Sequence, residues 1–139
     1  MTRTFIDSGV LVVAARGTEA DSERALAILV DRNREFASSL FVRLELLPKA
    51  IYHRKMDEAE FYQSFFDAVQ YWATDIEQLF QQSYEIACQY GLAALDALHI
   101  AAALSVDAEE FITTERTTKP MHRVTALKII SIASSELCS

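Results

Sequence analysis

Residues 5–13 read FIDSGVLVV, an apolar run interrupted by a single carboxylate. Such a run predicts a buried strand, yet burying an unpaired charge is costly unless water or a cation offsets it. We therefore expect Thr4–Asp7 to form a short strand that brings Asp7 to the edge of a sheet. A helical turn should follow over Val10–Ala15.

The composition predicts one helix-rich domain. The chain has 139 residues, a length typical of a single domain, so we expect residues 1–139 to share one core. With 3 Gly and 2 Pro, it has few residues that favour tight turns. Cys88 and Cys138 are far apart and outside any CxxC motif, so neither a disulfide framework nor a zinc site is expected. Cys88 should be a small buried hydrophobe, and Cys138 lies near the chain end.

The N-terminal segment and the longest apolar runs indicate where in the cell the protein is expected. Asp7 interrupts any signal-peptide core, and no apolar run reaches the ~18 residues that a membrane span needs. We therefore expect a cytoplasmic protein with no membrane partner.

Charge is distributed unevenly along the chain. The formal net charge of −7 argues against nucleic-acid binding, because neutralising phosphates dominates that affinity. From Met56 to Glu115 there are twelve acids and no Lys or Arg, whereas nine of the thirteen basic residues precede Met56 and four follow Glu115. Folding could place the two basic ends together on one face.

Hydrophobic periodicity predicts alternating strands and helices, and hence an α/β fold with helices on both faces of a mostly parallel sheet. Leu26, Leu29 and Val30 should face the core. Asp57 should cap its helix, and Gly91 should end another. The expected strands are Glu35–Val42, Tyr71–Ala73, Glu110–Thr114 and Leu127–Ile132; the expected helices are Asp21–Asn33, a segment after Val42 that Pro48 should kink, Asp57–Tyr71, Glu77–Tyr90 and Leu92–Ser105.

Four acids follow strands or start helices: Asp7, Glu45, Asp96 and Glu115. In an open parallel sheet the carboxyl ends of the strands form the ligand-binding crevice, so these acids should converge at one edge. Converging carboxylates repel one another unless a cation holds them together. Without a His/Cys cluster, an all-oxygen site favours Mg²⁺ or Mn²⁺, which suits phosphodiester hydrolysis. The alternative for each acid is an ordinary surface carboxylate or helix cap.

Four segments, in order and spanning almost the whole chain, resemble the acidic motifs of PIN-domain nucleases, the fold of VapC-type toxins. They read FIDSGVLVVAA (5–15), ASSLFVRLELLPKAI (37–51), YGLAALDALHIAAA (90–103) and FITTE (111–115). The resemblance implies a three-layer α/β/α sandwich with a parallel sheet of four or five strands. It also implies Mg²⁺- or Mn²⁺-dependent cleavage of RNA by the toxin of a toxin–antitoxin pair, with an antitoxin partner and a homodimer.

Carried over position by position, Asp7, Glu45 and Asp96 match the first three acids of the family and would bind the metal directly or through water. Ser8 matches a hydroxyl position beside the first acid, and Thr113 and Thr114 fall where a hydroxyl supports the last acid. Glu115 departs from the pattern, which has Asp there. One extra methylene moves the carboxylate by about 1.5 Å, whereas catalytic geometry tolerates about 0.5 Å.

Other residues have two readings each. His99 lies one helical turn after Asp96 and would either orient a carboxylate or be an ordinary core histidine. The aromatic segment 60–72 should be core or subunit interface rather than a base-stacking platform. The basic residues Arg43, Arg116, Lys119 and Arg123, with Arg16 more weakly, either form a rim that binds RNA phosphates or neutralise the acids and solvate the surface.

Two alternatives to the nuclease stay open at this stage. The first is a catalytically weakened PIN-like module that binds RNA or protein, since Glu115 replaces Asp. The second is a carboxylate phosphotransferase with Asp7 as nucleophile, like the haloacid dehalogenases. That chemistry needs a second acid two residues later, where the chain has Gly9, so it is disfavoured.

Overall fold

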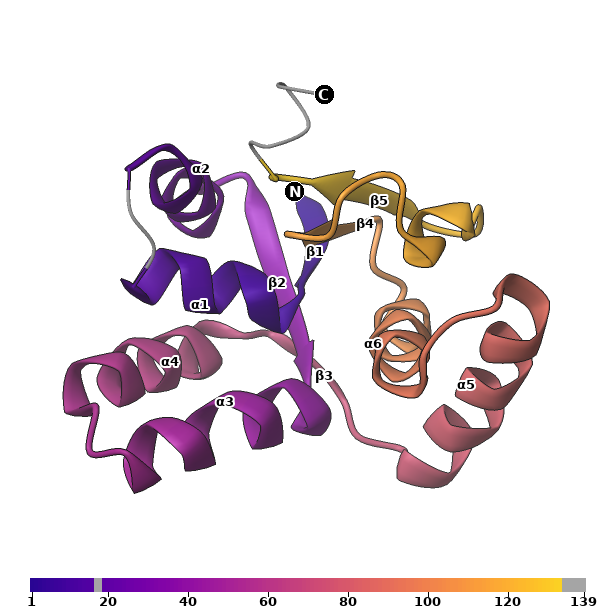
Figure 1. Ribbon diagram of the computed structural model, residues 1–139, viewed down its shortest axis with the longest axis horizontal. Helices are drawn as coiled ribbons and strands as arrows, with labels where there is room; N and C mark the ends of the chain where they lie inside the picture. The colour runs from indigo at the N-terminus through magenta and orange to yellow at the C-terminus, as the bar shows by residue number, and fades with distance from the viewer. Residues whose placement is uncertain (17–18, 134–139) are drawn as a thin grey trace.

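A five-stranded parallel sheet forms the centre of the molecule (Figure 1). The computed structural model describes residues 1–16 and 19–133. Within them the strand order is β3-β2-β1-β4-β5, and every pairing is parallel. The strands are β1 (Thr2–Ile6), β2 (Arg34–Ser39), β3 (Tyr71–Ala73), β4 (Glu110–Thr113) and β5 (Lys128–Ser131). The predicted sheet is therefore confirmed, with five strands.

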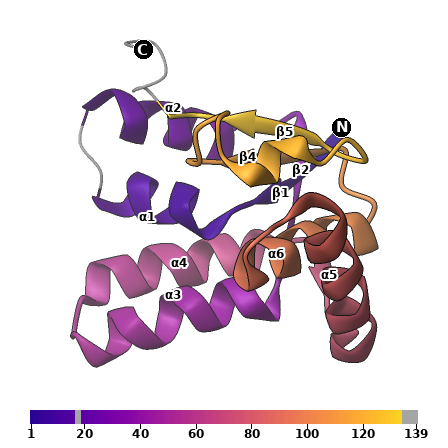
Figure 2. The ribbon, with the colours of Figure 1, turned by 45° about the vertical axis from the view of Figure 1, so that its right-hand side comes forward.

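Helices cover both faces of this sheet. Figures 1 and 2 place α1 to α4 on one side and the pair α5 and α6 on the other. The predicted three-layer α/β/α architecture is confirmed. The helices are α1 (Ser8–Arg16), α2 (Glu19–Leu29), α3 (Leu40–Tyr52), α4 (Met56–Ala68), α5 (Ile76–Tyr90) and α6 (Ala94–Ser105), and a 3₁₀ turn, η1 (Pro120–Arg123), precedes β5.

The end of β2 differs from the sequence prediction. The strand stops at Ser39 rather than Val42, because the Ser39 hydroxyl accepts a hydrogen bond from the Val42 backbone N–H (3.3 Å) and caps α3. Helix α3 continues through Pro48 to Tyr52. This early helix start brings Glu45 onto α3, close to the end of the strand.

Helix ends supply one confirmed prediction and one correction. Gly91 ends α5 in the left-handed conformation, with φ of 69°, as expected for a glycine after the last turn. Asp57 does not cap α4. The cap position is Lys55, which makes no capping side-chain bond, and Asp57 lies inside the first turn, where its charge favours the helix dipole.

Three apolar side chains lie on more open surfaces than predicted. Val30 is 74% exposed because α2 ends at Leu29, and Leu26 is 38% exposed, so Ala25 is the fully buried residue of this segment. Cys88 is exposed rather than buried, since it shares the outer face of α5 with Tyr84, one turn earlier. Cys138 lies outside the described residues.

The core forms between the central strands and the two helical layers. Phe5 on β1 stacks on Phe111 on β4 with ring centroids 5.4 Å apart. On α6, four consecutive small or branched residues, Ile100 to Ala103, are fully buried against the sheet. The predicted burial of the aromatic helix is confirmed for Tyr62, Phe65 and Phe66 of α4. No single described helix has the length and apolar composition to cross a membrane.

A buried ion pair joins the central strands at the amino end of the sheet. Glu110 on β4 is 7% exposed and accepts bonds from the Thr4 hydroxyl and from Nε of Arg34, both at 2.8 Å. Arg34, on β2, also binds Asp31 at 2.9 Å. One side chain therefore links β2 to β4 across β1, at the edge opposite to Asp7.

Replacing Arg34 by Ala should destabilise the protein by about 3 kcal/mol, because it leaves Glu110 buried without its cationic partner. Chemical denaturation measures this change. The matched control is Arg32→Ala, two residues earlier and exposed, which should stay within about 0.5 kcal/mol of wild type. Equal effects of the two substitutions would contradict the assigned role of Arg34.

Candidate active site

The candidate site lies at the carboxyl end of the two central strands. β1 and β4 are neighbours at the point where the strand order reverses direction, which is where open α/β sheets bind ligands. The backbone N–H of Asp7 continues the ladder to the carbonyl of Ile112 at 3.0 Å. This bond fixes Asp7 beside Thr113, the last residue of β4.

Asp7 is held by two hydrogen bonds and is only 7% exposed. Its Oδ2 accepts a bond from the Thr113 hydroxyl at 2.7 Å, and its Oδ1 accepts one from the Ser8 backbone N–H at 2.9 Å. Burial raises the pKa of Asp7; the nearby His99 and these two bonds oppose the rise. Thr113 in turn accepts the Glu115 backbone N–H at 3.1 Å, so one hydroxyl joins the first and fourth acid segments.

Glu45 reaches the same place from α3. Its Oε1 accepts a 2.7 Å bond from the Ser8 hydroxyl and lies 3.1 Å from Nε2 of His99 on α6. The bond with His99 is the main reason that the pKa of Glu45 is lowered. His99 itself is 2% exposed. His99 therefore fits both interpretations, because it is buried in the core and also contacts an acid.

Asp96 lies in the first turn of α6 and is half-buried. Its pKa is raised, first by loss of hydration and then by repulsion from Asp7 and Glu115, with a smaller repulsion from Glu45. Among the described residues, no hydrogen bond or ion pair engages its carboxylate or that of Glu115. The structure therefore gathers the four predicted acids in one neighbourhood and leaves two of them without a partner there.

Gly9 explains how β4 can approach α1 so closely. A methyl group on Gly9 would overlap the Thr114 hydroxyl. The position that disfavours a phosphotransferase thus has a packing reason to be glycine. Thr114 lies against α1, whereas Thr113 faces Asp7.

The donor set suits a hard divalent cation. Carboxylate oxygens are the ligands that Mg²⁺ and Mn²⁺ prefer, and the mutual repulsion that raises the pKa of Asp96 is what a cation would relieve. Within residues 1–16 and 19–133, no group of three acids, histidines or cysteines already has a metal-binding arrangement. Glu45 is held by Ser8 and His99 instead. The residues fit a metal by their chemistry and would have to close around it.

The predicted RNA-binding residues lie in two separate places. Arg43 lines an apolar pocket on α3 together with Leu44 and Ile51, away from the side that carries Glu45. Arg116 and Lys119 are exposed in the turn after β4. Arg123 donates to the carbonyl of Tyr90 at 3.1 Å, which satisfies the end of α5. Their contact with RNA stays a prediction.

Sequence reasoning missed a basic pocket next to Glu45. Lys49 and His53 line it, together with Arg16 at the end of α1. The signal was present as the four-residue spacing of Glu45, Lys49 and His53, which places the first two on one face of α3 and His53 on the same side at the C-cap.

Comparisons with known proteins agree with this fold. The family model described as "PIN domain" matches residues 4–124. Among solved structures, VapBC2 from Rickettsia felis bound to a promoter DNA fragment has a TM-score of 0.69 at 15% identity, covering 94% of this chain and 98% of that chain.

Two further solved structures are similar. A toxin–antitoxin complex from Klebsiella pneumoniae gives a TM-score of 0.68 at 16% identity, covering 93% of this chain and 97% of that chain. VapBC-1 from nontypeable Haemophilus influenzae gives 0.64 at 18% identity, covering 94% and 98%. At these identities the likeness is one of fold. No curated protein matches the chain in sequence.

Replacing Asp96 by Asn should raise the melting temperature at neutral pH in metal-free buffer. The folded protein holds the Asp96 proton to a higher pH than the unfolded chain does, so wild type loses stability as the pH rises from 3.8 through the raised pKa. Asn is neutral throughout, so the gain should vanish below pH 3.8. Thermal unfolding across this pH range measures it. The control Glu60→Gln removes an exposed acid of α4 and should change nothing; an Asp96→Asn protein that melts lower at neutral pH would contradict the assigned repulsion.

Proposed function

The chain belongs to the PIN domain family, and from this premise we propose that it is a Mg²⁺- or Mn²⁺-dependent endoribonuclease that hydrolyses RNA phosphodiesters. The observation that carries the proposal is that four acids, Asp7, Glu45, Asp96 and Glu115, meet at the carboxyl ends of β1 and β4, where the carboxylates of Asp96 and Glu115 have no other partner among the described residues. A cation bound there would relieve the repulsion between these carboxylates, and a metal held by carboxylates suits phosphodiester chemistry.

Asp7, Glu45, Asp96 and Glu115 would hold the ion. When bound, it would lower the pKa of a water molecule and neutralise charge on the phosphate. Asp96 and Glu115 supply the carboxylates that have no other partner among the described residues. The Glu115 side chain is one methylene longer than the Asp of the family. Its carboxylate would therefore bind the ion through water, or from a backbone position farther from the ion.

The remaining polar residues orient these acids. Thr113 and the Ser8 backbone N–H fix both oxygens of Asp7, so this carboxylate has one orientation. The Ser8 hydroxyl and His99 fix Glu45. Because partners of this kind hold metal ligands in place, we assign Ser8, His99 and Thr113 as positioning residues. Thr114 would act through its packing against Gly9.

We further propose that the protein is the toxin of a type II toxin–antitoxin system and works in the cytoplasm as a single domain over residues 1–139. Support comes from the fold, which is similar to chains of VapBC and other toxin–antitoxin complexes over nearly their whole length. An antitoxin protein would then be its partner. Arg116, Lys119, Arg123 and Arg43 stay candidate contacts to RNA.

A homodimer is the proposed assembly, formed by an apolar face on α3 and α5. Phe41 and Phe80 join the two helices with ring centroids 5.8 Å apart. Around them the exposed fractions reach 69% at Leu44 and 74% at Tyr84. These exposed apolar residues form a cluster, unlike the single apolar residues that are normal on a protein surface. A second copy of the chain would cover them.

The nuclease proposal predicts RNA cleavage that stops in EDTA and returns with Mg²⁺ or Mn²⁺. Asp96→Asn should reduce cleavage to background, whereas Ser8→Ala should lower it by about 10–100-fold because it loosens Glu45 without removing a ligand. A labelled single-stranded RNA of mixed sequence serves as substrate.

Substitutions of the fourth acid, Glu115, distinguish the nuclease proposal from the binding-module alternative. Glu115→Gln should abolish cleavage, and Glu115→Asp should retain it. If wild type binds RNA but cleaves no faster than Asp96→Asn with either metal, the nuclease proposal fails and the catalytically weakened RNA- or protein-binding module is the correct alternative.

The dimer proposal predicts that Leu44→Glu converts a dimer into a monomer, because two charges would face each other across the interface. Light scattering over a range of concentrations measures the mass. The control Val30→Glu places the same charge on an equally open apolar residue at the end of α2 and should leave the dimer intact. A monomeric wild type would overturn the assembly.

A further inference from the structure

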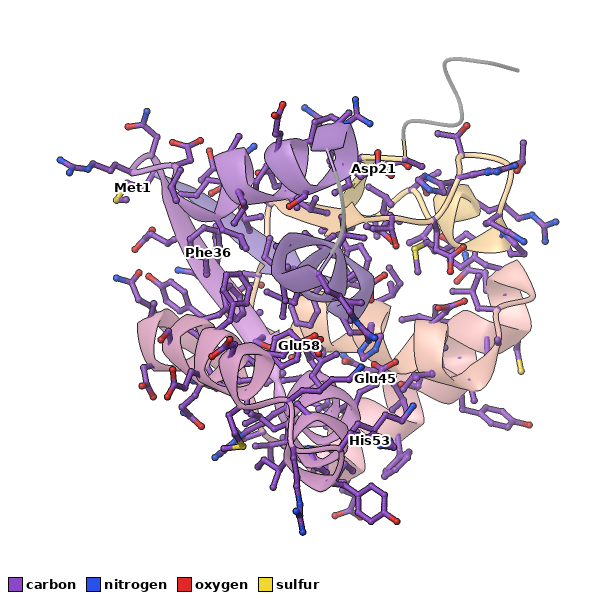
Figure 3. All side chains as sticks on the ribbon, turned by 60° about the vertical axis from the view of Figure 1, so that its left-hand side comes forward. Met1, Asp21, Phe36, Glu45, His53 and Glu58 are labelled. Atoms are coloured by element: carbon purple, nitrogen blue, oxygen red, sulfur yellow. The ribbon has the colours of Figure 1, made fainter. Side chains whose placement is uncertain are left out.

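A polar pocket adjoins the acid cluster. Of the four acids proposed to hold the metal, Glu45 is the one that lines this pocket. It has a volume of about 270 Å³ and lies between the end of α1, helix α3 and the start of α4. Figure 3 shows Glu45, His53 and Glu58 gathered on this side of the molecule. Its charged and titratable lining is Arg16, Glu45, Lys49, His53, Lys55, Glu58 and Tyr62.

The pocket continues directly from the active site along one face of α3. Glu45, Lys49 and His53 follow one another every four residues, so they form a stripe with a rise of about 6 Å per step. Glu45 contacts Ser8 and His99 at one end of this stripe. Lys49 and His53, both exposed, lead away from the acids and into the pocket.

Of the two acids of the pocket, Glu58 is paired with cations and Glu45 is hydrogen-bonded. Glu58 pairs with Arg16 at 3.1 Å and with Lys55 at 3.8 Å, and it accepts the Tyr62 hydroxyl at 3.2 Å. Glu45 accepts the Ser8 hydroxyl. Lys49 and His53 form no ion pair among the described residues. Lys49 and His53 are therefore the nitrogen-bearing side chains of the pocket that no ion pair occupies among the described residues.

We propose that this pocket binds a backbone phosphate of the RNA, one or two nucleotides from the phosphate that is cleaved, through Lys49 and His53. The inference rests on the proposed nuclease function and adds a substrate contact to it. A strand whose scissile phosphate lies at Asp7 and Asp96 carries further phosphates on both sides. Lys49, one helical turn from Glu45 on α3, is a cationic side chain on the wall that the pocket shares with Glu45.

A phosphate explains the pocket better than a protein segment does. Its lining is dominated by charged side chains, and the apolar residues Leu46 and Ala50 are buried beneath them. A chain with a net charge of −7 repels nucleic acid at long range, so it needs local cations beside the acid cluster to hold a polyanion. Phosphate contacts of this kind fix position along the strand and are independent of sequence.

The test measures binding of a fluorescein-labelled single-stranded RNA in EDTA, where no cleavage occurs, over a series of salt concentrations. Lys49→Gln should weaken binding several-fold and lower the slope of log K against log salt by about 0.7, the value for one lost phosphate contact in a single strand. Lys49→Arg should retain the slope. The matched control is Lys128→Gln, an exposed lysine on β5 opposite Glu110, at the other edge of the sheet, which should bind like wild type. His53→Ala should weaken binding further in the Lys49→Gln background.

Failure of this inference is distinguishable from failure of the nuclease proposal. If wild type cleaves RNA while Lys49→Gln and Lys128→Gln share one salt slope, the pocket is not a phosphate site although the nuclease stands. If the slope falls with Lys49→Gln but no metal supports cleavage, the contact stands and the nuclease proposal fails. A poly-glutamate peptide that displaces the RNA in a Lys49-dependent way, as well as unlabelled RNA does, would overturn the assignment to phosphate. Thermal unfolding checks that each variant folds.

Discussion

The structure depends on keeping one carboxylate, Asp7, almost buried at the end of the central strand. The backbone makes this possible, because the Asp7 N–H extends the β1–β4 ladder to Ile112 and brings the side chain to the Thr113 hydroxyl. The start of α1 adds the Ser8 N–H on the other oxygen. Donors at the end of a strand and at the start of a helix thus stabilise a charge whose burial is unfavourable.

The same network joins four segments that are far apart in sequence. Ser8 contacts both Asp7 and Glu45, Glu45 contacts His99 on α6, and Thr113 accepts the Glu115 backbone. Each polar residue therefore orients an acid and also ties two elements together. Only Asp96 and Glu115 keep carboxylates without such ties among the described residues. This division between fixed and available acids suits the cation that we propose.

The charge of the side chains on one face of α3 changes from negative to positive within two helical turns. The acid end of the helix face meets Asp7 and Asp96, and the basic end opens into the pocket of Lys49 and His53. The hydrogen bond with His99 is the main cause of the lowered pKa of Glu45, and Lys49, which forms no ion pair with Glu45, adds a smaller contribution. The proposed RNA and the proposed metal would therefore find complementary charges next to each other, despite the net charge of −7.

The sequence by itself determined the element order, the parallel sheet and the four acids, because apolar periodicity and strand-end acids are local signals. It also located Gly91, whose left-handed conformation follows from its place after a helix. It misjudged Cys88, Val30 and the cap of α4, since burial depends on which helix face meets a neighbour. Only the tertiary structure decided that Ser8 bridges two acids, that Arg43 lines an apolar pocket, and that Lys49 and His53 share a pocket with Glu45. The Ser8 bridge depends on the distance between two segments that are separated in the chain, which packing sets. The faces of α3 that carry Arg43, Lys49 and His53 follow from helical spacing, and packing decides what each face meets.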